Sequence, residues 1–178
     1  DYAKYFPTPN SWIVCKDYSC DGVSDFFTYG GLGEFDVYIG SYVGDTIHFA
    51  KRQKGAYFNT GGGDVNVYAT NVDKPSFVDV NNDGDLDYLS FNVGGTQMNY
   101  YENLRIELGL PCDSLFFEFF HPCWGHFYES GLDITVALAD TCSDSPTTRS
   151  TKTLHVGSVS EVADINGDGE LDMLLGDI

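Results

Sequence analysis

The feature that most constrains this chain is a nine-residue pattern that occurs three times. The pattern is Asp-x-[Asn/Ser]-x-Asp-Gly-x-x-Asp, and it spans residues 17–25, 79–87 and 164–172 as DYSCDGVSD, DVNNDGDLD and DINGDGELD. A single copy would be typical of a solvated turn, because Asp, Asn and Gly favour turns between strands. An arbitrary turn has no reason to repeat one register, so the three copies predict repeated units with a shared role.

The second copy illustrates why the pattern predicts a metal site. Alternate residues of a tight loop can face one centre, and positions 1, 3, 5 and 9 of this copy are Asp79, Asn81, Asp83 and Asp87. Without a cation their carboxylates would repel one another, and hard oxygen ligands favour Ca²⁺. Gly84 at position 6 allows the sharp turn that brings the carbonyl of Asp85 to the ion, and we expect the Asp85 side chain to point outward.

The residues around the pattern exclude an EF-hand. An EF-hand needs a bidentate Glu at position 12 and a helix on each side of the loop. Position 12 is instead Thr28, Ser90 or Leu175, and flanking stretches such as SFVDV and LDYLSFNV have the composition of short strands. The sequence therefore predicts strand-loop-strand sites in which the Asp at position 9 takes the ligand role of that Glu.

Composition agrees with an all-β fold and excludes some partners. The chain has 178 residues, 42% of them hydrophobic and 15% aromatic, with 20 Gly and only 2 Met, which favours turn-rich β structure. A formal charge of −18 argues against nucleic acid and anionic membranes as partners, because both require basic patches. Three bound Ca²⁺ would add six charges and bring −18 to −12.

No part of the sequence resembles a membrane or targeting segment. It contains no apolar run of about 18 residues, so we expect no transmembrane helix and no insertion into a membrane. The first residues, DYAKYFPTPNSW, lack the basic and apolar regions of a signal peptide. We expect that a leader has been removed or that the chain is a piece of a longer protein.

Five cysteines indicate disulfides and an oxidising compartment. They are Cys15, Cys20, Cys112, Cys123 and Cys142. We expect Cys15 and Cys20 to form a bridge that clamps the first loop, with two small buried thiols as the alternative. One of the other three must then lack a partner within this chain. Disulfides together with calcium loops favour a location outside the cytoplasm.

The spacing of the loops predicts the architecture. The second loop begins 62 residues after the first (79 minus 17), and the third begins 85 residues after the second (164 minus 79). The first interval holds the strand-like pieces SDFFTY, FDVYIGSY, TIHFAKRQ, AYFNT and VNVYATN between Gly-rich turns. About four strands in about 60 residues are typical of one blade of a β-propeller. The second interval begins similarly and then carries a Cys- and aromatic-rich insertion, about residues 110–150.

Three further details of the sequence point to a known family: the three nonamers, their openings VDV and ADI, and continuations such as DYLSFNVGGTQMNYYEN. In these details the chain resembles the FG-GAP/VCBS repeats of integrin α-subunit propellers and of many bacterial surface proteins. The resemblance covers most of the chain apart from the insertion, and in that family the loop joins two strands of a blade and holds Ca²⁺. It implies about three calcium ions with these ligands: Asp17, Ser19, Asp21, the Val23 carbonyl and Asp25; Asp79, Asn81, Asp83, the Asp85 carbonyl and Asp87; Asp164, Asn166, Asp168, the Glu170 carbonyl and Asp172. Ser19 and the cysteines of the first loop depart from the family pattern.

The resemblance also implies a partial propeller. The intervals amount to about two and a half blades, whereas closed propellers have about 4 to 8. We therefore expect residues 1–178 to form one partial domain of a larger propeller. The insertion, with PCDS and CWG, is similar to versions in secreted proteins of Gram-negative bacteria, which implies an extracellular or cell-surface location.

Catalytic motifs are absent from the sequence. It contains no G-x-S-x-G, H-E-x-x-H or P-loop, and GGGD at 61–64 reads as a hairpin turn. Cys112, His121, Cys123 and His126 could suggest zinc, but their spacing fits no common zinc pattern. The aromatic residues of the insertion offer a possible contact surface, with burial as the alternative: Trp124, Phe127 and Tyr128.

These observations favour a non-enzymatic, calcium-binding binding or adhesion module with a protein or carbohydrate ligand at the cell surface. One alternative is the propeller of a carbohydrate-active enzyme or its sugar-binding module. Another is a structural part of a bacterial secretion or outer-membrane assembly. Propellers serve many functions, so the fold alone does not choose between them.

Overall fold

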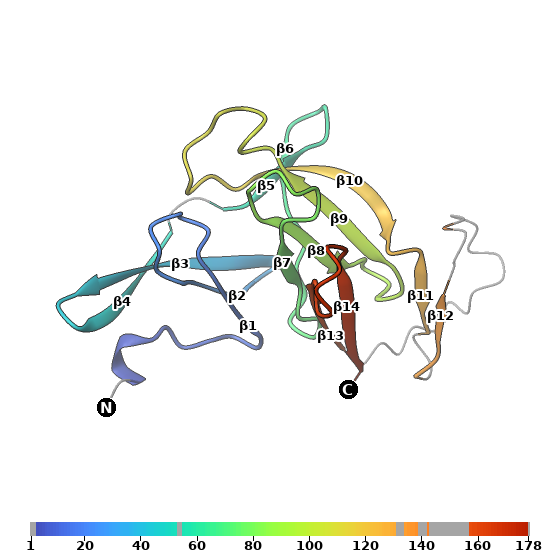
Figure 1. Cartoon of the computed structure of the whole chain (residues 1–178), viewed down its shortest axis with the longest axis horizontal. Helices are drawn as coiled ribbons and strands as arrows, with labels where there is room; N and C mark the ends of the chain where they lie inside the picture. Colours follow the sequence, from blue (N-terminus) through green and yellow to red (C-terminus); the bar gives the residue numbers. More distant parts are fainter. Residues whose placement is uncertain (1–2, 53–54, 131–133, 139–141, 143–156, 178) are drawn as a thin grey trace.

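The computed structural model describes residues 3–52, 55–130, 134–138, 142 and 157–177, and these residues form an all-β fold (Figure 1). They contain one short 3₁₀-helix, η1 (Ala3–Tyr5), and no α-helix. The strands are β1 (Ile13–Lys16), β2 (Asp25–Gly31), β3 (Glu34–Val43), β4 (Thr46–Lys51), β5 (Tyr57–Asn59), β6 (Asp64–Asn66), β7 (Ser76–Val78), β8 (Asp87–Phe91), β9 (Met98–Asn103), β10 (Phe116–Trp124), β11 (Phe127–Glu129), β12 (Val136–Leu138), β13 (Ser158–Ala163) and β14 (Asp172–Asp177). The all-β prediction is confirmed.

The first sheet is an antiparallel meander of four strands in the order β1-β2-β3-β4. Alternating side chains of β3 face inward, so Phe35 and Val37 are buried whereas their neighbours are partly exposed. A β-bulge between Tyr29 and Gly31 lies next to the turn that joins β2 to β3. The strand-like pieces of the first interval therefore correspond to real strands, and the first three of them are β2, β3 and β4.

The second sheet contains six strands in the order β6-β5-β10-β9-β8-β7. Strands β7 to β10 form another antiparallel meander of four, and β5 adds to it by pairing in parallel with β10. Strand β10 lies within the segment 110–150 that we assigned to an insertion, yet it is an integral strand of this sheet. The separate part of that segment begins after β10, with the hairpin of β11 and β12, and residues 131–133, 139–141 and 143–150 lie outside the described residues.

The hairpin of β13 and β14 is the third unit, and it packs on the second sheet beside β7 (Figure 1). Lys74, just before β7, donates its backbone N–H to Ser158 and its Nζ to Glu161 at 2.8 Å. Lys16 of β1 also lies 3.8 Å from Glu161. The first strands of the three units, β1, β7 and β13, therefore lie next to one another, and none of the sheets closes into a barrel.

Aromatic rings form the core between the first two sheets. Phe77 of β7 lies 4.3 Å from Phe27 of β2 and 5.0 Å from Tyr88 of β8, measured between ring centroids. Phe35 of β3 stacks on Tyr88 at 5.2 Å, and the ring of Phe117 of β10 lies 6.2 Å from the same tyrosine ring. A second cluster fills the space between the second sheet and the third hairpin: Leu89, Phe91, Met98, Tyr100, Phe127 and Val162.

The disulfides differ from the expected pairing. Cys20 bonds to Cys112, Cys123 bonds to Cys142, and Cys15 is exposed and unpaired. The predicted bridge between Cys15 and Cys20 is therefore wrong: the alternation of β1 turns Val14 inward and leaves Cys15 exposed, and Cys20 bonds to Cys112 instead. The pairing also removes the zinc alternative, since the sulfur atoms of Cys112 and Cys123 are in disulfides. No helix among the described residues is long and apolar enough to cross a membrane.

We predict that Phe77→Ala destabilises the protein by about 3–5 kcal/mol, because it removes a ring at the centre of the aromatic core and leaves a cavity. The matched control is Phe120→Ala, which removes a ring that is 61% exposed and should cost less than about 1 kcal/mol. Urea unfolding followed by tryptophan fluorescence measures both. Equal losses for the two variants would contradict this account of the core.

Candidate functional site: three acidic loops

Each copy of the repeated pattern occupies the same place in its unit. Loop 1 (residues 17–25) joins β1 to β2, loop 2 (79–87) joins β7 to β8, and loop 3 (164–172) joins β13 to β14. Every loop thus connects the first two strands of its unit, and those two strands pair antiparallel. The prediction that each loop joins two strands is confirmed, and the EF-hand remains excluded because no α-helix flanks any loop.

The carboxylate at position 1 closes each loop in the same way. Asp79 accepts the backbone N–H of Asp83 at 3.0 Å and that of Gly84 at 2.9 Å, at positions 5 and 6. The equivalent carboxylates accept the same two N–H groups in the other loops: Asp17 from Asp21 and Gly22, and Asp164 from Asp168 and Gly169. These bonds hold the position 1 side chain inside the loop.

The glycine at position 6 has the conformation that the pattern predicts. Gly22, Gly84 and Gly169 have φ of +84°, +98° and +92°, in the left-handed region where a Cβ is strained. Nothing lies within 4 Å of the place where a Cβ would stand, so the backbone conformation and not crowding requires glycine here.

The carboxylate at position 9 ties each loop to its sheet. Asp87 is fully buried, and its Oδ2 accepts the N–H of Val80 at 2.8 Å while its Oδ1 accepts that of Asn103 in β9 at 2.8 Å. Asp25, also fully buried, accepts from Tyr18 and from Gly40 of β3 in the same manner. In both units the third strand of the meander therefore holds the second end of the loop.

Loop 3 keeps part of this arrangement. Asp172 accepts the N–H of Ile165 at 3.0 Å, as Asp87 accepts that of Val80. Among the described residues β14 pairs with β13 alone, and Asp172 is only partly buried. Its carboxylate is therefore more open to water than the carboxylates of Asp25 and Asp87.

Burial changes the acidity of two carboxyl groups in loop 2. Burial raises the pKa of Asp87 to about 7, although the N–H groups of Asn103 and Val80 act in the opposite direction. Burial and the nearby charge of Asp83 raise the pKa of Asp85 to about 6, against the Ile106 N–H and the Arg105 guanidinium. Both groups release their protons more readily in the unfolded chain.

The side chain of Asp85 does not point outward as predicted. It is buried, its Oδ2 accepts the N–H of Ile106 at 3.2 Å, and Arg105 Nε lies 3.6 Å from the same oxygen. Arg105 also donates from Nη2 to the carbonyl of Gly84 at 2.8 Å. The connection between β9 and β10 folds over loop 2, and this cover is invisible in the nine-residue pattern itself.

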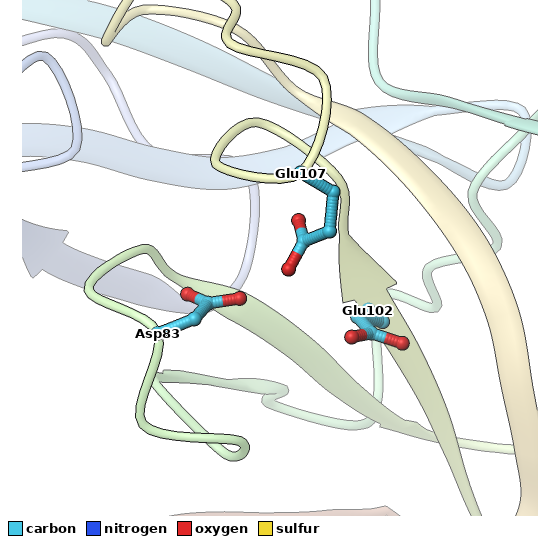
Figure 2. A group of neighbouring side chains, drawn as sticks. All are labelled: Asp83, Glu102 and Glu107. Atoms are coloured by element: carbon cyan, nitrogen blue, oxygen red, sulfur yellow. The ribbon is translucent and has the colours of Figure 1, made fainter.

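Three carboxylates gather beside loop 2: Asp83, Glu102 and Glu107 each place an oxygen within 4.8 Å of the others (Figure 2). No other His, Cys, Asp and Glu side chains among the described residues form such a group of three or more. Asn81 lies between two of these carboxylates, and its Nδ2 donates to Asp83 at 2.7 Å and to Glu102 at 2.9 Å. Asp83 and Asn81 are predicted ligands, whereas Glu102 and Glu107 are not.

The strand register could have revealed Glu102. Tyr88 pairs with Tyr101 in the hairpin of β8 and β9, so Glu102 stands one residue further along, next to the end of loop 2. Glu107 belongs to the connection after β9, whose path no local pattern predicts. The other predicted ligands stay in their loops, where most of their side chains accept backbone N–H groups, and they join no group of three carboxylates.

The possible contact surface of the insertion is only partly available. Phe127 is 1% exposed and packs on Phe91 at 6.1 Å, because β11 turns it toward the second hydrophobic cluster. Trp124 packs against the same cluster, and Tyr128 is half-buried. Phe127 is therefore a core residue, and the alternative of burial is the correct one for it.

The chain was compared with known proteins of three kinds. No family model, curated protein or solved structure matches the chain. What the loops can do must therefore be argued from their residues and geometry.

We predict that, with calcium removed by a chelator, stability falls as the pH rises from about 4 to 7. The folded-state pKa of Asp87 is about 7 against an ordinary value of 3.8, so its stabilising contribution is complete below pH 3.8 and is lost by about pH 7. Asp87→Asn cannot titrate and should reduce this slope, by at most about 1.4 kcal/mol per pH unit. Urea unfolding at several pH values measures the difference, and equal slopes in both chains would contradict it.

Proposed function

We propose that this chain is an extracellular calcium-binding module in which Ca²⁺ rigidifies the three acidic loops. The observation that carries the proposal is the identical hydrogen-bond arrangement of the loops: in each, the position 1 carboxylate accepts the N–H groups of positions 5 and 6, at a left-handed glycine. A surface that only needed acidity would not keep this geometry three times.

The donor set of loop 2 fits a hard cation. Asp83, Glu102 and Glu107 supply carboxylate oxygens within 4.8 Å of one another, and Asn81 adds an amide between two of them. The amide nitrogen now donates to two carboxylates, and rotation of the amide would turn its oxygen to the same place. Oxygen ligands in this number suit Ca²⁺. In loops 1 and 3 the same fit rests on the predicted pattern ligands.

The chain's own residues prepare these sites. Asp79 and Asp87 accept backbone N–H groups that fix the loop ends, and we expect the left-handed glycine turn to aim the position 7 carbonyl inward. A bound Ca²⁺ would supply the positive charge that offsets the repulsion among the carboxylates. With three ions the net charge would change from −18 to −12.

The strand arrangement supports the FG-GAP/VCBS resemblance and a propeller. Two antiparallel meanders of four strands each carry an acidic loop between their first and second strands, and the third hairpin repeats that start. Strands β1, β7 and β13 lie next to one another, as the first strands of neighbouring blades would around an axis. We propose that the sheets are blades of such a propeller.

The two disulfides favour an extracellular location. Extracellular calcium is plentiful, so even weak loops of this kind would be filled there. We propose that the rigid, calcium-loaded sheets act as a binding or adhesion platform, or as a structural module, at the cell surface. The ligand would be a protein or a carbohydrate.

A calorimetric Ca²⁺ titration of the chelator-treated chain should give close to three equivalents. Binding to the folded state alone raises the melting temperature, because the added stability is RT ln(1 + [Ca]/Kd). Melting curves and limited proteolysis with and without chelator provide a second readout. If the chelator changes neither, a structural role for Ca²⁺ is ruled out.

We predict that Glu102→Gln weakens calcium binding at loop 2 by about tenfold, because the amide replaces a charged ligand next to Asp83. Asp45→Asn is the matched control, since it removes one charge from an exposed turn between β3 and β4 and should leave affinity nearly unchanged. Calorimetry on both variants measures the change. Equal affinities would remove Glu102 from the site.

A further inference from the structure

A continuous bridge joins loop 1 to loop 2. Cys20, at position 4 of loop 1, forms a disulfide with Cys112 in the connection between β9 and β10. Arg105 in the same connection donates from Nη1 to the Cys112 sulfur at 3.7 Å and from Nη2 to the Gly84 carbonyl at 2.8 Å. One covalent bond and two hydrogen bonds thus link the two acidic loops.

The bridge contacts loop 2 at Gly84 and Asp85, the residues that form its sharp turn. Gly84 is the left-handed turn residue at position 6, and Asp85 at position 7 supplies the carbonyl expected to reach the ion. Arg105 Nε lies 3.6 Å from the Asp85 carboxylate, and the two side chains are 10% and 2% exposed. Removing Arg105 would leave a buried carboxylate without its cation, so this contact is firmly held.

The two loops also lie close together in space. Both loops line one cavity of about 190 Å³, to which loop 1 contributes Asp17 and Cys20 and loop 2 contributes Asp79 and Gly84. Arg105 and Cys112 also line this cavity. A change in the order of one loop therefore reaches the other through Cys112 and Arg105.

We propose that the Cys20–Cys112 disulfide and Arg105 couple the two loops, so that Ca²⁺ bound in loop 1 raises the affinity of loop 2, and the reverse. An ion in loop 1 holds Cys20, and the disulfide and Arg105 carry that restraint to Gly84 and Asp85. Loop 2 then loses less conformational freedom when its own ion binds. Such coupling is reciprocal by thermodynamic necessity. The inference rests on the proposed calcium sites.

The experiment measures loop 2 affinity by calorimetry in chains whose loop 3 is disabled by Asp164→Asn with Asp168→Asn. Loop 1 is either intact or disabled by Asp17→Asn with Asp21→Asn, and the bridge is either intact or removed by Cys20→Ser with Cys112→Ser. With the bridge, disabling loop 1 should weaken loop 2 by about fivefold or more. Without the bridge, the loss should be less than about twofold.

Two further variants keep the test decisive. Cys123→Ser with Cys142→Ser removes the other disulfide, away from loops 1 and 2, and should preserve the coupling. Arg105→Lys retains the disulfide and a positive charge beside Asp85, but a single ammonium cannot reproduce the planar fork that meets both Gly84 and Cys112. Arg105→Lys should therefore reduce the coupling between the loops. This variant tests the proposal even if the chain with Cys20→Ser and Cys112→Ser does not fold.

Hydrogen exchange gives a readout that does not depend on loop 2 affinity. In a chain with loop 2 disabled by Asp79→Asn and Asp83→Asn, adding Ca²⁺ should slow exchange at the Gly84 and Asp85 amides only while the bridge is intact. If disabling loop 1 leaves the calcium affinity of loop 2 unchanged while the bridge is present, the proposed coupling is wrong. The proposed calcium sites are not contradicted by that result. If the unmodified chain binds no Ca²⁺, both proposals are overturned.

Discussion

The structure depends on a carboxylate buried at the point where loop 1 and loop 2 each return to their sheet. Asp25 and Asp87 are fully buried. Asp25 accepts two N–H groups of its own loop and Asp87 accepts one, and each accepts a further N–H from the third strand of its meander. A buried carboxylate without such donors would be costly. In the first unit the third strand passes so close that a Cβ at Gly40 would overlap the Ser24 carbonyl. The same buried carboxylates therefore fix both the shape of the loop and the position of the third strand.

This anchoring explains why so acidic a chain can form a compact array of sheets. The aromatic core attaches the first sheet to the second through Phe27, Phe35, Phe77 and Tyr88, so apolar burial and not charge pairing joins the two sheets. Two ion pairs stand where units meet: Lys16 of the first and Lys74 of the second both reach Glu161 of the third. The three loops hold 11 of the 27 acidic residues, and a cation would have its largest effect there.

The sequence predicts local features well and distant contacts poorly. The position of the loops between strands and their left-handed glycines follow from nine consecutive residues, so the pattern alone was sufficient. The partner of Cys20 lies 92 residues away, and the cover of Asp85 by Arg105 depends on how the connection after β9 folds back. Glu102 is an intermediate case, because the register of β8 and β9 places it beside loop 2 once the hairpin is known.

The three loops share one pattern, but the surrounding structure supports them unequally, which ranks them as the calcium sites that we propose. Loop 2 has a third strand that holds Asp87 and two additional carboxylates, Glu102 and Glu107. Loop 1 has the third strand and a disulfide but only Ser19 at position 3. Loop 3 has the full pattern, yet its Asp172 remains partly exposed to water. Because a preformed loop loses less entropy on binding, affinity should decrease from loop 2 to the other two loops.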